Sequence, residues 1–144
     1  MNVLVIHGPN LNLLGTRELE VYGAVTLEEI DGLLRTRARD TDMSLEIHQT
    51  AREGEIIELL HSGIGRVAGA LLNPGAYSHT SRAIADAIRA VPYPVIEVHL
   101  SNIHARESWR RVSVTAEAAL GIVAGLGPHS YLAALSALEG MVSE

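Results

Sequence analysis

Five short apolar runs, separated by longer segments of helical periodicity, constrain the fold more than any other feature of the sequence. The runs are rich in Val, Ile and Leu and cover residues 3–6, 45–48, 67–72, 95–100 and 121–124. Such alternation is typical of β-strands joined by α-helices. Because strands that are apolar along their whole length are buried on both faces, the pattern predicts a parallel sheet between two layers of helices.

Four stretches of helical periodicity complete the pattern. The first is expected to begin at Thr26, whose hydroxyl can cap the helix while Glu29 reaches back to it. The others centre on residues 56–64, 83–88 and 131–142. With 144 residues and no evident linker, we expect one α/β domain over residues 1–144. By analogy we expect a flavodoxin-like, five-stranded parallel sheet of order 2-1-3-4-5 with helices on both faces.

Two absent residue types narrow the chemistry. All 11 basic residues are arginine, and the chain contains neither lysine nor cysteine. Schiff-base enzymes, P-loop lysines, thiol nucleophiles, disulfides and cysteine-ligated zinc are therefore excluded. The net charge of -6 argues against non-specific binding of nucleic acid. The start lacks a signal peptide, and no stretch approaches the ~20 apolar residues of a membrane span, so we expect a cytoplasmic protein without a membrane partner.

The longest connection, residues 7–25, is the strongest candidate for a mobile element. It far exceeds the ~2–6 residues usual between strand and helix in α/β units. Its glycines can serve as pivots around Arg17 and Tyr22, which suits a lid over about residues 15–25 that closes on a ligand. A phenol has an ordinary pKa of about 10, so Tyr22 becomes a base near neutral pH only if a guanidinium such as that of Arg17 stabilises its ionised form. A packing role for Tyr22 is the alternative.

Polar residues follow the carboxyl ends of the first, third and fourth runs. They are His7 and Asn10, then Asn73, Ser78 and His79, then Glu97, His99, Ser101 and Asn102. In a doubly wound sheet this edge forms the ligand crevice. Glu97 and His99 are two residues apart and share one face of the strand, so the carboxylate can favour the imidazolium that a general acid requires. A purely structural Glu–His pair is an equal alternative.

Arginines cluster just after this edge, at positions 106, 110 and 111. Their bidentate geometry suits a carboxylate or phosphate, with Arg110 the better ligand candidate and a solvated face the preferred interpretation for Arg111. His79 precedes the third predicted helix, whose N-terminus favours anions. Asp86 lies about two turns further along the same face, as a solvent-facing charge or a contact to another subunit.

A metal site is the minor alternative for these side chains, because folding can bring distant ligands together. Its candidate ligands are His79, Asp86, Glu97, His99 and His104.

Taken together, five motifs resemble one known family. They are GPNLNLLG, TRELEVYG, NPGAYSHTS, EVHLSNIHARESWRR and GIVAGLG, in this order and over nearly the whole chain. They resemble the type II 3-dehydroquinate dehydratases of the shikimate and quinate pathways. The resemblance implies a flavodoxin-like subunit, assembled as a dodecamer from trimers, that converts 3-dehydroquinate to 3-dehydroshikimate with loss of water. It implies no metal and no organic cofactor.

The resemblance also implies catalytic roles, carried over by position. Tyr22 would remove the proton at C2, and Arg17 would stabilise its phenolate. Asn10, through an ordered water, would stabilise the resulting enolate. His99, supported by Glu97, would then protonate the departing hydroxyl.

The resemblance further implies how substrate is held. Asn73, His79 and Arg110 would bind its hydroxyls, and the backbone amides of Leu100 and Ser101 its carboxylate. Asp86 would reach the site of a neighbouring subunit.

Three positions depart from the family's pattern. Leu19 stands where proline is usual, His7 stands where asparagine is usual, and the stretch around Ala51 lacks the usual asparagine. These departures bear on rate and affinity more than on the type of reaction. Two rival functions remain at this point: a flavodoxin-like binding or regulatory module without turnover, and a metal-dependent hydrolase.

Overall fold

A computed structural model describes residues 1–143 and contains one five-stranded sheet of order β2-β1-β3-β4-β5. Every pairing between neighbouring strands is parallel. The strands are β1 (Asn2–His7), β2 (Ser44–Gln49), β3 (Gly69–Asn73), β4 (Val95–His99) and β5 (Gly121–Ala124). The predicted fold class and strand order are therefore confirmed.

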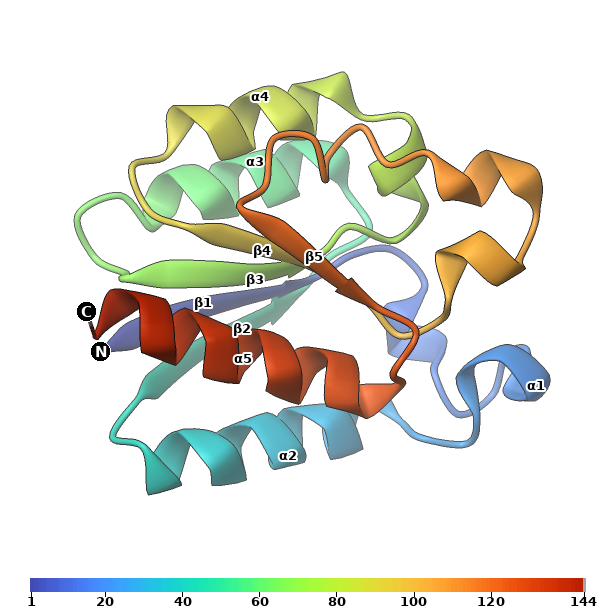
Figure 1. Cartoon of the computed structure of the whole chain (residues 1–144), viewed down its shortest axis with the longest axis horizontal. Helices are drawn as coiled ribbons and strands as arrows, with labels where there is room; N and C mark the ends of the chain where they lie inside the picture. The colour runs from blue at the N-terminus through green and yellow to red at the C-terminus, as the bar shows by residue number, and fades with distance from the viewer. Residues whose placement is uncertain (144) are drawn as a thin grey trace.

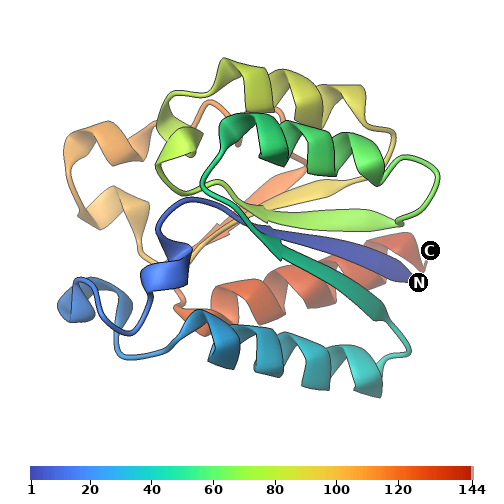
Figure 2. The same ribbon diagram turned by 180° about the vertical axis from the view of Figure 1, so that it is seen from behind.

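Helices cover both faces of this sheet (Figure 1). Helices α2 (Leu27–Asp40) and α5 (Pro128–Val142) pack together on one face, and α3 (Glu53–Ser62) and α4 (Arg82–Ala90) pack together on the other. The view from behind shows the same three layers (Figure 2). Within residues 1–143, none of the helices combines the length and the apolar character needed to cross a bilayer.

Alternate side chains of β1 enter two separate hydrophobic cores. Val3 and Val5 lie in the core beneath α2 and α5, whereas Leu4 and Ile6 lie in the core beneath α3 and α4. All four side chains have no exposed surface, and burying each contributes about 1.5–3 kcal/mol. Because successive side chains of a strand point to opposite faces, a central strand must be apolar throughout.

Capping residues set the helix boundaries that periodicity only approximated. The Thr26 hydroxyl accepts a hydrogen bond from the backbone N–H of Glu29 at 3.1 Å, which starts α2 as predicted. Helix α4 starts in the same way at Ser81, whose hydroxyl accepts from the N–H of Ile84 at 3.0 Å. Helix α5 begins at Pro128, earlier than its apolar stripe, because proline suits the first position of a helix.

The long connection after β1 folds into two short helical turns, η1 (Leu11–Leu13) and α1 (Leu19–Tyr22). Both lie beyond the carboxyl ends of the strands, beside the turns η3 (Ile103–Ala105) and η4 (Ser108–Arg111) (Figure 1). Gly15 has φ of 92°, and a Cβ there would lie 2.9 Å from the Thr26 side chain. Glycine is therefore needed where the chain turns toward α1.

Candidate active site

A pocket with a cavity volume of about 100 Å³ opens at the carboxyl ends of β1, β3 and β4. Most of the site residues predicted from the sequence line it: Asn10, Arg17, Tyr22, Asn73, His79, His99, Leu100, Ser101 and Arg110. The ligand crevice thus lies where the doubly wound topology places it.

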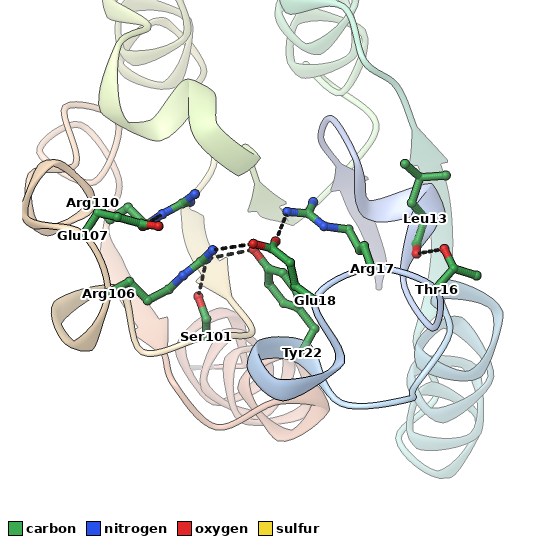
Figure 3. Close-up of polar contacts among 9 residues, drawn as sticks. All are labelled: Leu13, Thr16, Arg17, Glu18, Tyr22, Ser101, Arg106, Glu107 and Arg110. Atoms are coloured by element: carbon green, nitrogen blue, oxygen red, sulfur yellow. Dashed lines mark hydrogen bonds and ion pairs between the residues drawn. The ribbon is translucent and has the colours of Figure 1, made fainter.

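Tyr22 extends from α1 toward two arginines of different origin (Figure 3). Its hydroxyl accepts a hydrogen bond from Nη1 of Arg106 at 2.8 Å. The guanidinium carbon of Arg17 lies 4.7 Å from the centroid of the Tyr22 ring, and that of Arg106 lies 5.2 Å from it. The direct donor to the phenol oxygen is therefore Arg106, whereas spacing had pointed to Arg17.

Glu18 links the same two arginines across the mouth of the pocket (Figure 3). Its carboxylate lies 2.5 Å from Nη2 of Arg17 and 3.8 Å from Nη2 of Arg106. The hydrogen bond from Arg17 lowers the pKa of Glu18, and the positive charges of Arg17, Arg106 and Arg110 lower it further. The lid is thus attached to the segment after β4 by charge pairing.

His99 and Glu97 form a buried pair at the end of β4. Nε2 of His99 lies 2.7 Å from Oε2 of Glu97, and the side chains are 7% and 0% exposed. Ser113 donates its hydroxyl to the same carboxylate oxygen at 2.7 Å, and Thr115 donates to Oε1. Because hydrogen bonds to a carboxylate favour its ionised form, Glu97 is equipped to support a positively charged imidazole.

The remaining polar side chains of the pocket are held by their neighbours. Nδ1 of His79 lies 2.7 Å from the carbonyl oxygen of Val112, which assigns that nitrogen as a donor and leaves Nε2 as the acceptor. Arg110 pairs with the carboxylate of Glu107, and its guanidinium lies 4.2 Å from the Trp109 ring. These contacts fix the orientation of both side chains before any ligand enters.

Asp86 lies apart from the pocket in the single subunit. It lies on α4, its side chain is 83% exposed, and it pairs with Arg89 at 3.5 Å. Asp86 is therefore not among the residues that line the pocket of its own subunit.

The side chains of the alternative metal site do not converge. Across residues 1–143, no three His, Asp or Glu side chains come close enough together to hold a metal ion. Instead, two sets of side chains meet at one pocket. One is a phenol that lies between two guanidiniums, and the other is a histidine paired with a carboxylate. Such a set can remove a proton from carbon and deliver another to a leaving group.

Sequence reasoning gave no specific role to Arg106, Glu18, Ser113 or Thr115. In the sequence, Arg106 stands out only as a member of a basic cluster. The spacing of Ser113 and Thr115 from Glu97 matches no motif that would predict their contact. The only sign in the sequence of the charge pairing in the lid is that Arg17 and Glu18 are adjacent.

Comparisons with known proteins identify one family. The family model described as dehydroquinase class II matches residues 1–139. A protein named 3-dehydroquinate dehydratase from Caldanaerobacter subterraneus is 52% identical over 137 residues, which are 95% of this chain and 93% of that protein. Another of this name, from Wolinella succinogenes, is 49% identical over 144 residues, covering 100% of this chain and 87% of that protein.

Solved structures agree. A type II dehydroquinase from Butyrivibrio crossotus superposes with a TM-score of 0.94 at 38% identity, covering 96% of this chain and 97% of that one. The type II dehydroquinase from Propionibacterium acnes gives 0.92 at 39% identity, with 96% of each chain covered.

Proposed function

The chain belongs to the class II dehydroquinase family and is a lyase that dehydrates 3-dehydroquinate, and from this premise we propose that Tyr22 is its base and His99 its general acid. The observation that carries this proposal is that both side chains line one pocket although they come from two different elements, α1 and β4. An anti elimination needs two such groups, a base and an acid that act on different sides of the substrate.

In the first step, Tyr22 as phenolate takes the proton from C2 beside the ketone. A phenol serves as a base near neutral pH only when its ionised form is stabilised by about 4 kcal/mol. A charge-assisted hydrogen bond contributes about 1.5–3 kcal/mol, and Arg106 donates one to the Tyr22 oxygen at 2.8 Å. The guanidinium of Arg17, 4.7 Å from the ring centroid, adds Coulomb attraction.

The electrons of the broken C–H bond form an enolate, which needs a hydrogen-bond donor at its oxygen. Asn10 supplies this donor through an ordered water. Asn10 has a positive φ of 70°, a conformation that asparagine tolerates better than most residues. The backbone there is shaped to turn its side chain toward the pocket that it lines.

In the second step, His99 gives a proton to the hydroxyl on the carbon next to C2, and water leaves as the C=C bond forms. Glu97 supports the imidazolium, and the hydroxyls of Ser113 and Thr115 hold the Glu97 carboxylate in place. The proton that Tyr22 gained and the proton that His99 lost are then exchanged with solvent, which restores both groups.

Substrate binding falls to the other polar groups of the pocket. Asn73, His79 and Arg110 hold hydroxyls, and the backbone amides of Leu100 and Ser101 hold the carboxylate. Asp86 acts in the pocket of a neighbouring subunit, in a dodecamer built from trimers. The reaction needs no metal and no organic cofactor.

The direct test mixes purified protein with 3-dehydroquinate and follows the absorbance of the conjugated enone. We expect a rise proportional to enzyme concentration and unaffected by chelators. Binding of the substrate without any absorbance change would indicate a non-catalytic module. Activity lost to chelators and restored by divalent ions would indicate a metal-dependent enzyme.

A further inference from the structure

Three polar side chains form a hydrogen-bonded line that begins on α2, and a fourth, which lines the pocket, lies beside this line on the neighbouring strand. In order they are Asp31, His7, Tyr131 and Asn73, here called the polar relay. Nε2 of His7 lies 2.7 Å from Oδ1 of Asp31, and Nδ1 of His7 lies 2.8 Å from the Tyr131 hydroxyl. Neither Asp31, His7 nor Tyr131 has a part in the chemistry described above.

We propose that the polar relay is a positioning device, in which His7 and Tyr131 orient the side-chain amide of Asn73 toward substrate. This inference rests on the proposed function, because it takes the pocket to be the substrate site. His7 and Tyr131 are both 0% exposed. Buried polar groups of this kind are held firmly because each unmade hydrogen bond costs free energy.

With the His7 ring neutral, the donor inventory gives the direction of each hydrogen bond. The carboxylate of Asp31 only accepts, so Nε2 of His7 carries the hydrogen between them. In a neutral imidazole the other nitrogen, Nδ1, then accepts, and the Tyr131 O–H is its donor. The Tyr131 oxygen keeps its lone pairs for a donor on the other side.

In the proposal, Asn73 provides that donor. Asn73 lies on β3 at the level of His7, and its amide opposes the rise that burial causes in the pKa of Tyr131. The Asn73 carbonyl oxygen accepts from the backbone N–H of Gly75 at 3.1 Å. With its oxygen and one N–H engaged, the Asn73 amide has one N–H left for a ligand.

The sheet brings the members of the polar relay together. His7 and Asn73 are paired residues in the register of β1 and β3, so their side chains leave neighbouring strands at the same level. Tyr131 reaches this point from α5, and its ring meets that of His7 edge to face at 5.2 Å between centroids. His7, which departs from the family's usual asparagine, therefore has a defined partner on each side.

The first experiment replaces Tyr131 with phenylalanine, which deletes the relay's central oxygen and keeps the ring. An amide that has lost its orientation should bind substrate more weakly without changing the chemical steps. We expect KM to rise about three- to tenfold, the worth of one hydrogen bond, and kcat to stay within about twofold.

Tyr93→Phe is the matched control. Tyr93 is also buried, and its hydroxyl donates to the carbonyl of Leu60 in the other hydrophobic core, away from the pocket. A general loss of stability affects both variants, whereas only loss of the polar relay raises KM. If Tyr131→Phe and Tyr93→Phe have the same KM as the wild type, the polar relay is structural only and the proposal is wrong.

Two substitutions at His7 separate its two nitrogens. Asparagine places a polar atom near the position of Nδ1 and retains a partner for Tyr131, so His7→Asn should keep KM near the wild-type value. Glutamine reaches the position of Nε2 and retains a partner for Asp31 alone, so His7→Gln should raise KM as Tyr131→Phe does. Equal KM values for the two variants would contradict the proposal.

A double-mutant cycle tests whether Tyr131 acts through Asn73. In an Asn73→Ala background, Tyr131→Phe should cause no further rise in KM, because the amide that it orients is absent. Additive effects would overturn the proposal.

A readout without substrate keeps the two proposals separate. Nitrogen-15 NMR of the His7 ring should show a neutral imidazole protonated at Nε2, with Nδ1 losing its hydrogen-bond signature in Tyr131→Phe. A wild-type protein with this signature but without enone formation would contradict the proposed function alone. A doubly protonated or Nδ1-protonated ring would contradict the polar relay alone, even in an active enzyme or in one whose Tyr131 variant does not fold.

Discussion

The hydroxyl of Tyr22 accepts a hydrogen bond from Nη1 of Arg106 at 2.8 Å, although 84 residues separate them in sequence. The bond joins residues 15–25 to the segment after β4, so the contact that ties these two segments together also places positive charge beside the oxygen of the proposed base.

Replacing Arg106 with glutamine should lower kcat by about 30- to 100-fold, because a charge-assisted hydrogen bond to the phenolate is worth ~2–3 kcal/mol. Glutamine retains an N–H but removes the positive charge. Steady-state rates in the enone assay measure the effect. Arg111→Gln, at an exposed arginine of the same segment, is the control and should leave kcat unchanged.

Tyr22→Phe should abolish turnover while leaving folding intact, because the ring that packs against the hydrophobic core is retained. The enone assay measures turnover, and circular dichroism with thermal melting measures folding. Near-normal activity in this variant would show that another group is the base.

His99→Ala should slow elimination strongly while exchange of the substrate's C2 proton with deuterated solvent persists. The reason is that proton removal by Tyr22 precedes the step that needs the acid. Mass spectrometry of recovered 3-dehydroquinate measures the exchange. Loss of the fold instead would mean that the pair with Glu97 is structural.

Thr115→Val keeps the shape of the side chain and deletes the hydroxyl that donates to Oε1 of Glu97. A carboxylate that has lost this hydrogen bond is held less firmly beside His99, so the imidazole is oriented less well toward the leaving hydroxyl. We expect kcat to fall about tenfold. Thr115→Ser retains the hydroxyl and should keep the wild-type kcat; an unchanged kcat in Thr115→Val would argue against this role.

Alkaline solution should destabilise the fold through its buried tyrosines. Burial raises the pKa of Tyr93 to about 12 and that of Tyr131 further, whereas both are about 10 in the unfolded chain. The stability that comes from keeping these phenols neutral is therefore complete below about pH 10 and is lost above it, by ~1.4 kcal/mol per pH unit for each tyrosine. Urea denaturation between about pH 9 and 12 measures this slope, which Tyr93→Phe should reduce; a flat dependence in the wild type would refute the prediction.

The sequence determined the fold and much of the site because the relevant signals are local. The apolar runs predict β1 to β5, and Thr26 predicts the start of α2, since side-chain periodicity and capping follow directly from backbone geometry. The two-residue spacing of Glu97 and His99 predicts their common face for the same reason. Beyond this, the roles proposed for Tyr22, Asn10 and Arg17 rest on the resemblance of motifs to a known family.

Contacts between side chains that are far apart in sequence follow from the packing of the folded chain. No periodicity in the sequence predicts that Arg106, and not Arg17, donates to Tyr22. The same is true of the hydrogen bond from Thr115 to Glu97. It is also true of the contacts of His7 with Asp31 and Tyr131. Such contacts depend on how whole elements pack, which brings α5, β1 and β3 to one point. They also depend on the rotamers that this packing allows.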